Sequence, residues 1–164
     1  MKAKPVLILM AAFALLLGSC QNHPQTLADQ IDRLKRQVSD DANTLRRLED
    51  SEWLQLQNDF RHCDSLLQHM DSAQVATAFE KLNLVHAYLN QFSELKADMR
   101  QKMEYSLLQL DRLKADAESH YINDSLAAAY LKTETQVADT LHHRVLYFQE
   151  KFGNCRKSLS DLKK

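Results

Sequence analysis

The amino-acid sequence predicts an all-α fold, an up-down-up bundle of three long helices with coiled-coil-like seams. The first observation is compositional: the 164 residues include two glycines and two prolines, and only Pro24 and Gly153 lie beyond residue 19. Average chains carry about 7% Gly and 5% Pro, so this scarcity nearly excludes strand turns. The second observation is that apolar residues recur at alternating spacings of three and four, the heptad pattern of packed helices.

Residues 1–19 have the layout of a cleaved signal peptide. Residues 1–4 carry two lysines, residues 6–17 are continuously apolar, and two small residues precede Cys20. The apolar run is too short to span a bilayer stably, and the small residues mark a cleavage site. The segment Leu17-Gly18-Ser19-Cys20 resembles the lipobox of bacterial lipoproteins. The alternative is an ordinary secreted protein cut near Ser19, in which Cys20 is an incidental thiol.

The resemblance implies that the Cys20 sulfur receives a diacylglycerol, that cleavage precedes Cys20, and that the new amino terminus is acylated, for example with palmitate. The chain then divides into a cleaved signal peptide (1–19), an acylated cysteine with a short tether (20–25) and a helical bundle domain (26–164). Gln21 follows the cysteine where an Asp would signal retention, which resembles sorting to the outer membrane. Because residues 21–24 contain no acid, we expect the periplasmic face of the cell envelope.

The charge balance argues against nucleic acid as a partner. The whole chain has 21 basic and 22 acidic residues. Cleavage after residue 19 removes Lys2 and Lys4, which leaves 19 basic and 22 acidic residues and a net charge of about −3. A near-neutral, evenly mixed surface does not suit phosphate binding.

The first helix is expected to begin after Pro24 and to carry a seam with one irregularity. Asp41 is a polar defect in that seam, and near Ser51 the pattern resumes one residue late. A bulge, a change of twist or a short break must absorb the extra residue. If the helix breaks, Ser51 caps a separate helix and the bundle has four helices. The predicted seam positions are Leu27, Ile31, Leu34, Val38, Leu45, Leu48, Trp53, Leu56, Phe60, Cys63, Leu67 and Met70.

The second helix has the longest seam, in which eleven of thirteen positions are apolar. Lys96 and Ser106 interrupt it, and such polar seam residues more often set register than perform chemistry. Additional apolar residues widen the stripe, as expected of a helix that touches two neighbours. The seam positions are Val75, Ala78, Leu82, Val85, Leu89, Phe92, Lys96, Met99, Met103, Ser106, Leu110, Leu113 and Ala117.

The third helix repeats the pattern from Leu131 to Leu162, with Glu134 as its polar member. Gly153 either ends this helix as a C-cap or lies within a seam that continues; we expect the seam to continue. The joins, near residues 71–72 and 120–125, are too short for parallel crossovers, so consecutive helices are expected to be antiparallel.

Cys63 and Cys155 both occupy seam positions in a chain predicted to reach an oxidising compartment. The first and third helices are parallel, and each cysteine lies near the end of its helix. We therefore expect similar heights and a possible disulfide, worth on the order of 4 kcal/mol for so long a loop. The alternative is two small buried hydrophobic residues.

Two acid–histidine pairs are spaced one helical turn apart, Asp59 with His62 and Asp139 with His142. This spacing suits metal ligation, but both pairs flank the seam, so a solvated face is the better interpretation. The sequence contains no metalloprotease, phosphate-loop or haem motif. We expect neither an enzyme nor a cofactor. If the bundle opened to bind a small ligand or metal, the expected lining is His86, Phe92, Met99, Met103 and Tyr105.

Asp-Ser or Asp-Thr followed by an apolar residue occurs four times, which resembles an O-glycosylation signal that some bacteria apply to exported proteins. The candidate hydroxyls belong to Ser65, Ser72, Ser125 and Thr140. At Ser72 and Ser125 the competing interpretation is helix N-capping.

The sequence as a whole predicts a lipid-anchored, non-catalytic helical scaffold or interaction module. Its expected partners are the membrane, through acylated Cys20, and either an envelope protein or a second copy of the chain. The alternative is a periplasmic bundle that binds a small ligand or metal.

Overall fold

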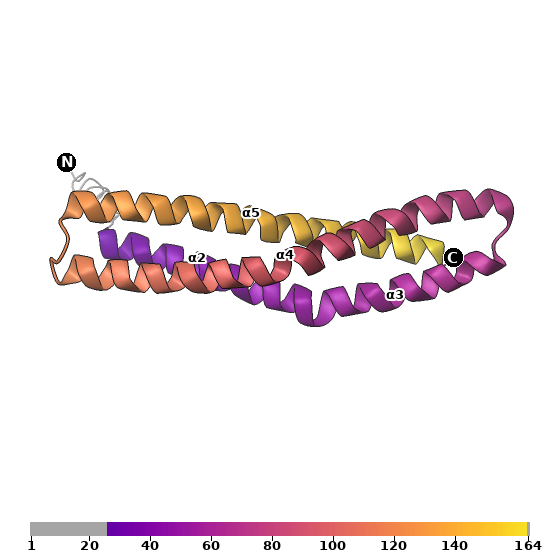
Figure 1. The fold of residues 1–164 in the computed structure, drawn as a ribbon, viewed down its shortest axis with the longest axis horizontal. Helices are drawn as coiled ribbons and strands as arrows, with labels where there is room; N and C mark the ends of the chain where they lie inside the picture. Colours follow the sequence, from indigo (N-terminus) through magenta and orange to yellow (C-terminus); the bar gives the residue numbers. More distant parts are fainter. Residues whose placement is uncertain (1–25, 164) are drawn as a thin grey trace, which may run out of the picture.

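The computed structural model describes residues 26–163, which form three long helical arms and no strand. Figure 1 shows the arms packed side by side as an elongated rod, with α4 antiparallel to the other two. This confirms the predicted all-α, up-down-up bundle. The first arm comprises α2 (Leu27–Arg47), a π-helical turn η1 (Leu48–Glu52), α3 (Trp53–Leu66) and a 3-10 turn η2 (Leu67–His69); the others are α4 (Ser72–Glu118) and α5 (Asp124–Leu162).

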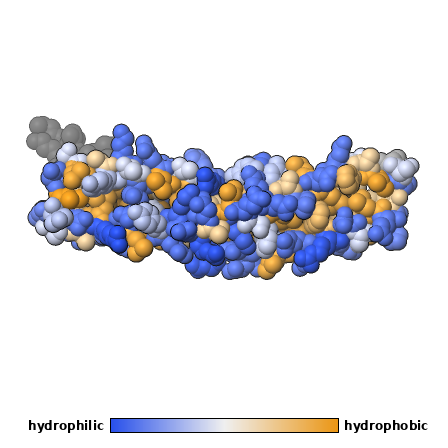
Figure 2. All heavy atoms as spheres, viewed as in Figure 1, coloured by the Kyte–Doolittle hydropathy of each residue, from blue (hydrophilic) through white to orange (hydrophobic). Residues whose placement is uncertain are grey.

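The predicted seams form one continuous core along the rod. Phe92, Phe148 and Phe152 are its largest members, and their rings meet edge to face at centroid separations of 4.9–6.3 Å. Figure 2 shows hydrophilic residues over the middle of one face and more apolar residues towards both ends. The buried apolar residues are Ile31, Leu34, Val38, Leu45, Leu48, Leu56, Cys63, Ala78, Leu82, Val85, Leu89, Phe92, Met99, Met103, Leu110, Leu113, Ala127, Leu131, Ala138, Leu141, Val145, Phe148, Phe152, Cys155 and Leu159.

The helices begin at polar side chains that accept hydrogen bonds from otherwise unpaired backbone N–H groups. Thr26 and Asp29 form a capping box at the start of α2. The Asp71 carboxylate accepts from the Gln74 N–H at 2.9 Å, and the Asn123 side chain accepts from the Leu126 N–H at 2.9 Å. The competing interpretation, in which Ser72 and Ser125 cap these helices, is therefore wrong, because Asp71 and Asn123 supply the acceptors.

The extra residue in the first arm is absorbed by the π-helical turn η1. The backbone stays in the right-handed helical region at Arg47, Leu48, Glu52 and Trp53, so the arm does not break. The Ser51 hydroxyl donates to the Arg47 carbonyl at 2.8 Å and does not cap a new helix. The four-helix alternative is thus wrong. A π-turn adds one residue without ending the helix, so the apolar face realigns beyond it.

Gly153 lies inside α5, as the continued seam predicted, and is exposed. A Cβ built at this position meets no atom within 4 Å outside the helix's own turn. Gly153→Ala is therefore expected to raise the free energy of unfolding by about 0.5–1 kcal/mol, because alanine loses less backbone entropy on folding. Chemical denaturation measures this change. Ala129→Gly, at an exposed position of the same helix, should lower stability by a similar amount; a destabilised Gly153→Ala would contradict the prediction.

Candidate functional site

At the π-helical turn η1, the side chains of Glu49 and Glu52 point towards the other arms. The ion pairs that they form are the most distinctive polar cluster of the rod. The Glu49 carboxylate lies 3.3 Å from the Lys96 ammonium and 3.2 Å from the Arg100 guanidinium, both on α4. The Glu49 and Lys96 side chains are 18% and 20% exposed, so their attraction is less screened than that of a surface pair. The predicted polar seam residue Lys96 thus pairs across helices.

Trp53, the first residue of α3, completes the contact with α4. The Lys96 ammonium lies 4.1 Å from the centre of the indole ring, within the range of a cation–π interaction. The indole Nε1–H donates to the Leu89 carbonyl at 3.3 Å. Lys96 is therefore held between a carboxylate and an aromatic face.

Glu52 connects the same turn to α5. Its carboxylate lies 3.0 Å from the Arg156 guanidinium and 3.5 Å from that of Arg47. Through Glu49 and Glu52 the π-turn makes ion pairs with both other arms. This short turn therefore has polar contacts with all of the packed arms.

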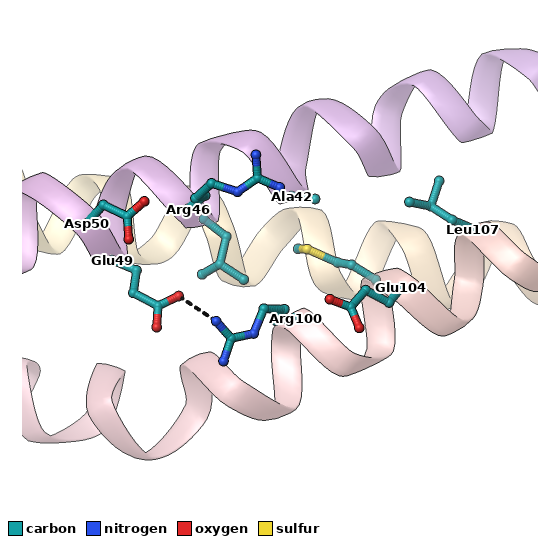
Figure 3. A pocket seen from close by; sticks show the side chains of 9 residues that line it. Ala42, Arg46, Glu49, Asp50, Arg100, Glu104 and Leu107 are labelled. Atoms are coloured by element: carbon teal, nitrogen blue, oxygen red, sulfur yellow. Dashed lines mark hydrogen bonds and ion pairs between the residues drawn. The ribbon is translucent and has the colours of Figure 1, made fainter.

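An open groove of about 380 Å³ lies between this turn and α4. Figure 3 shows Glu49 and Arg100 facing each other across it, with the Arg46, Asp50 and Glu104 side chains nearby. The charged lining residues are two cations and three anions, so the groove selects neither charge sign strongly. Its lining residues are Ala42, Leu45, Arg46, Glu49, Asp50, Arg100, Met103, Glu104 and Leu107.

Glu49→Gln is expected to lower the free energy of unfolding by about 1–2 kcal/mol, because Lys96 loses a carboxylate while four-fifths of its side chain stays covered. Urea denaturation measures the change. Lys102→Gln breaks an exposed Lys102–Asp98 pair on α4 and should cost less than about 0.5 kcal/mol. Equal losses in the two variants would show that the Glu49 pair contributes no more than a surface pair.

A second polar layer lies nearer the start of α2. Asp41 is 7% exposed, and its two carboxylate oxygens lie 2.9 and 3.1 Å from Nδ1 of His142. The Ser106 hydroxyl donates to the Glu134 carboxylate at 3.1 Å. The seam pattern predicted Asp41, Ser106 and Glu134 as polar seam positions. It did not predict that Asp41 pairs with His142.

The predicted acid–histidine pairs are not brought together as metal ligands. His142 contacts Asp41 on α2, and the Asp59 carboxylate lies 2.6 Å from the Lys163 ammonium. Between residues 26 and 163, no group of three or more His, Cys, Asp or Glu side chains is arranged to hold a metal ion.

The side chains expected to line a ligand cavity also lie apart. Phe92, Met99 and Met103 are fully buried in the core, whereas Tyr105 is 61% exposed. The exposed His86 ring stacks on Phe60 at a centroid separation of 5.5 Å. These five residues therefore do not share one cavity.

Cys63 and Cys155 are buried as separate thiols, so the predicted disulfide is not formed in the structure. The expectation of equal heights is wrong. The Cys63 thiol lies 3.5 Å from the Leu159 carbonyl, and Asp59, one turn before Cys63, pairs with Lys163. Leu159 follows Cys155 by four residues on α5. Cys155 therefore lies at least one helical turn, about 6 Å, nearer the start of α5 than the level of Cys63.

Both thiols are expected to resist modification in the folded protein. Burial raises the pKa of Cys63 and raises that of Cys155 to about 11, so Cys155 carries little thiolate, the reactive form, at pH 8. In a chain beginning at Gln21, we expect slow labelling under native conditions and two labelled thiols in denaturant. Labelling in denaturant that appears only after reduction would instead establish a bridge.

The four candidate glycosylation hydroxyls lie on exposed residues. The Ser65 hydroxyl donates to the His62 carbonyl at 2.6 Å, and the Thr140 hydroxyl to the Gln136 carbonyl at 2.8 Å. Ser72 and Ser125 lie in the first turns of α4 and α5, at opposite ends of the rod. Glycosylation at these positions stays a prediction.

The predicted signal peptide and the candidate lipidation site Cys20 lie outside the described residues. None of the helices in the described part of the chain is both long and apolar enough to cross a membrane. Comparisons with protein-family models, with curated proteins and with solved structures found no match to this chain.

Proposed function

We propose that this chain is a lipoprotein of the bacterial cell envelope, anchored through acylated Cys20, and that its helical rod is a non-catalytic interaction module. The observation that carries the proposal is the segment Leu17-Gly18-Ser19-Cys20, which follows a basic start and an apolar run. The residues after the cysteine favour the outer membrane and its periplasmic face. In this proposal the acyl chains provide the attachment, since more than one chain is needed for stable anchoring.

The surface of the rod supports binding of a protein partner. Tyr105 and Leu108 on α4 are 61% and 56% exposed, and Tyr130 and Val137 on α5 are 51% and 39% exposed. Lys102 lines two shallow grooves, one with Tyr105 and Leu108 and the other with Val137. This α4–α5 surface offers aromatic and aliphatic contacts of the kind enriched at protein interfaces. We propose an envelope protein or a second copy of the chain as the partner.

Cell fractionation of the native chain and of Cys20→Ala tests the anchor. The native chain should sediment with the outer membrane and enter the detergent phase, whereas Cys20→Ala should remain in the aqueous phase. Identical partition of the two would remove the proposed anchor.

Crosslinking in intact cells tests the interaction module. We expect a specific adduct that Tyr105→Asp and Val137→Asp weaken, because a charge on the α4–α5 surface opposes its burial. Phe79→Asp, at an exposed position near the start of α4 and 26 residues before Tyr105, is the control. An adduct unaffected by the first two variants would exclude this surface. Sedimentation of residues 21–164 as more than one chain would identify the partner as a second copy.

A further inference from the structure

The end of the rod where the α4–α5 loop lies is also the end where α2 begins (Figure 1). The Lys114 ammonium lies 2.6 Å from the Asp32 carboxylate, and Lys35 pairs with Asp111. Because α2 and α4 are antiparallel, these two ion pairs place the first turn of α2 level with the last turn of α4. The loop of residues 119–123 therefore projects at the tip nearest to the chain that leads back to Cys20.

The loop turn has a defined geometry that leaves an aromatic ring outside the core. His120 has a φ of 55°, the Tyr121 N–H donates to the Asp116 carbonyl at 2.9 Å, and the His120 N–H donates to the Ala117 carbonyl at 3.2 Å. This is a Schellman motif, in which the residue at the position of Tyr121 commonly makes an apolar contact with that at the position of Asp116. Here that position holds an acid, and Tyr121 is 81% exposed. Its ring is therefore left largely uncovered by this turn.

Ile122, the next residue, packs against the core. The two consecutive side chains therefore point in opposite directions. Ile122 faces the core and Tyr121 faces outward. Tyrosine is suited to a membrane surface, since its ring prefers the interface between acyl chains and water while its hydroxyl remains hydrated.

Residues 21–25 are all that separate Cys20 from Thr26. Fully extended, this stretch spans at most about 20 Å. If Cys20 is held in the bilayer surface, the tip of the rod lies within that distance of the lipid headgroups. Trp53 is 26 residues beyond Leu27, so it lies about 40 Å further along the rod.

We infer that the α4–α5 loop touches the bilayer end on, with the Tyr121 ring inserted among the lipid headgroups as a second contact beside the acyl anchor. This inference rests on the proposed lipid anchor. The tip also carries Asp116, Glu118 and Asp124, which an anionic surface would repel, so the contact suits a zwitterionic lipid surface.

Fluorescence quenching by brominated lipid tests the contact. The acylated protein is reconstituted into phosphatidylcholine vesicles, with or without bromine on the upper part of the acyl chains. Two single-tryptophan proteins are compared, Trp53→Phe with Tyr121→Trp, and Trp53→Phe with Tyr105→Trp. The second places the probe at an exposed tyrosine 13 residues, or about 20 Å, before the end of α4. If Trp53→Phe does not fold, each tyrosine variant is measured with Trp53 retained and the parent's emission is subtracted.

We expect insertion into either kind of vesicle to blue-shift the emission at position 121, and brominated lipid to reduce its intensity. Emission at position 105 should be unchanged in both. Co-flotation with vesicles but no quenching at 121 would overturn the tip contact and leave the anchor standing. Quenching at both positions would show a rod lying flat, which also overturns the end-on contact. Failure of the protein to float with the vesicles would remove the anchor itself, and this inference with it.

Discussion

Deletion of Ser51 is expected to leave the bundle folded with its stability changed by less than about 1 kcal/mol, whereas deletion of Gln101 is expected to cost more than about 4 kcal/mol. Ser51 is exposed and lies within the π-helical turn, which holds one residue more than a regular helix requires. Removing it converts the turn to regular α-helix and brings Leu48 and Trp53 to the four-residue spacing of the seam. The neighbouring core positions keep their faces.

Gln101 is equally exposed but lies in the regular part of α4. Deleting it rotates the rest of that helix by about 100° relative to the core, because each residue turns the helix by 1/3.6 of a circle. Met103, Leu110 and Leu113 would leave the buried face. Circular dichroism with urea denaturation measures both variants. Comparable destabilisation by the two deletions would show that the π-turn does not accommodate an extra residue.

Phe92→Ala is expected to lower the free energy of unfolding by about 3–5 kcal/mol, the range for removing a fully buried aromatic side chain. The Phe92 side chain is wholly buried, and its ring centroid lies 5.0 Å from that of Phe148 and 4.9 Å from that of Phe152. Trp53 approaches it from the first arm at 6.5 Å. The substitution leaves a cavity where all three arms meet.

Phe79→Ala is the matched control, on the same helix and of the same chemistry. Phe79 is 55% exposed, so its loss should cost about 0.5 kcal/mol. The urea midpoint should fall far more for Phe92→Ala, with similar slopes in the two variants. Equal shifts would mean that the aromatic cluster is not the centre of the core.

The helix arrangement could be predicted because it depends on local patterns. Each apolar residue at seam spacing needs only its neighbours three and four positions away to define a buried face. The seam positions from Leu82 to Leu113 were predicted in this way and are buried, apart from Lys96, whose side chain is 20% exposed. The short joins then fixed the antiparallel order.

Features that depend on the relative height of the arms could not be predicted. The spacing around Ser51 showed an extra residue but fitted a bulge, a twist or a break equally well. Cys63 and Cys155 were expected at one level because helix ends were counted from the sequence, and an error of a few residues moves a side chain by a full turn. The pairing of Asp41 with His142 depends on the same heights.

Surface features were the least accessible to sequence reasoning. The groove beside Glu49 lies where the end of α2 and the start of η1 face α4, and the exposed Tyr121 follows a residue with positive φ, His120. Histidine is not the residue that such a turn usually selects. Neither feature has a periodic pattern in the sequence.

The central claim is that Cys20 is the acylated amino terminus of the finished protein. Its most direct test is the intact mass of the native protein extracted from cell membranes with detergent. We predict the mass of residues 20–164 increased by one diacylglyceryl group and one amide-linked fatty acid. A mass that includes Met1, or one that shows no lipid on Cys20, would contradict the account.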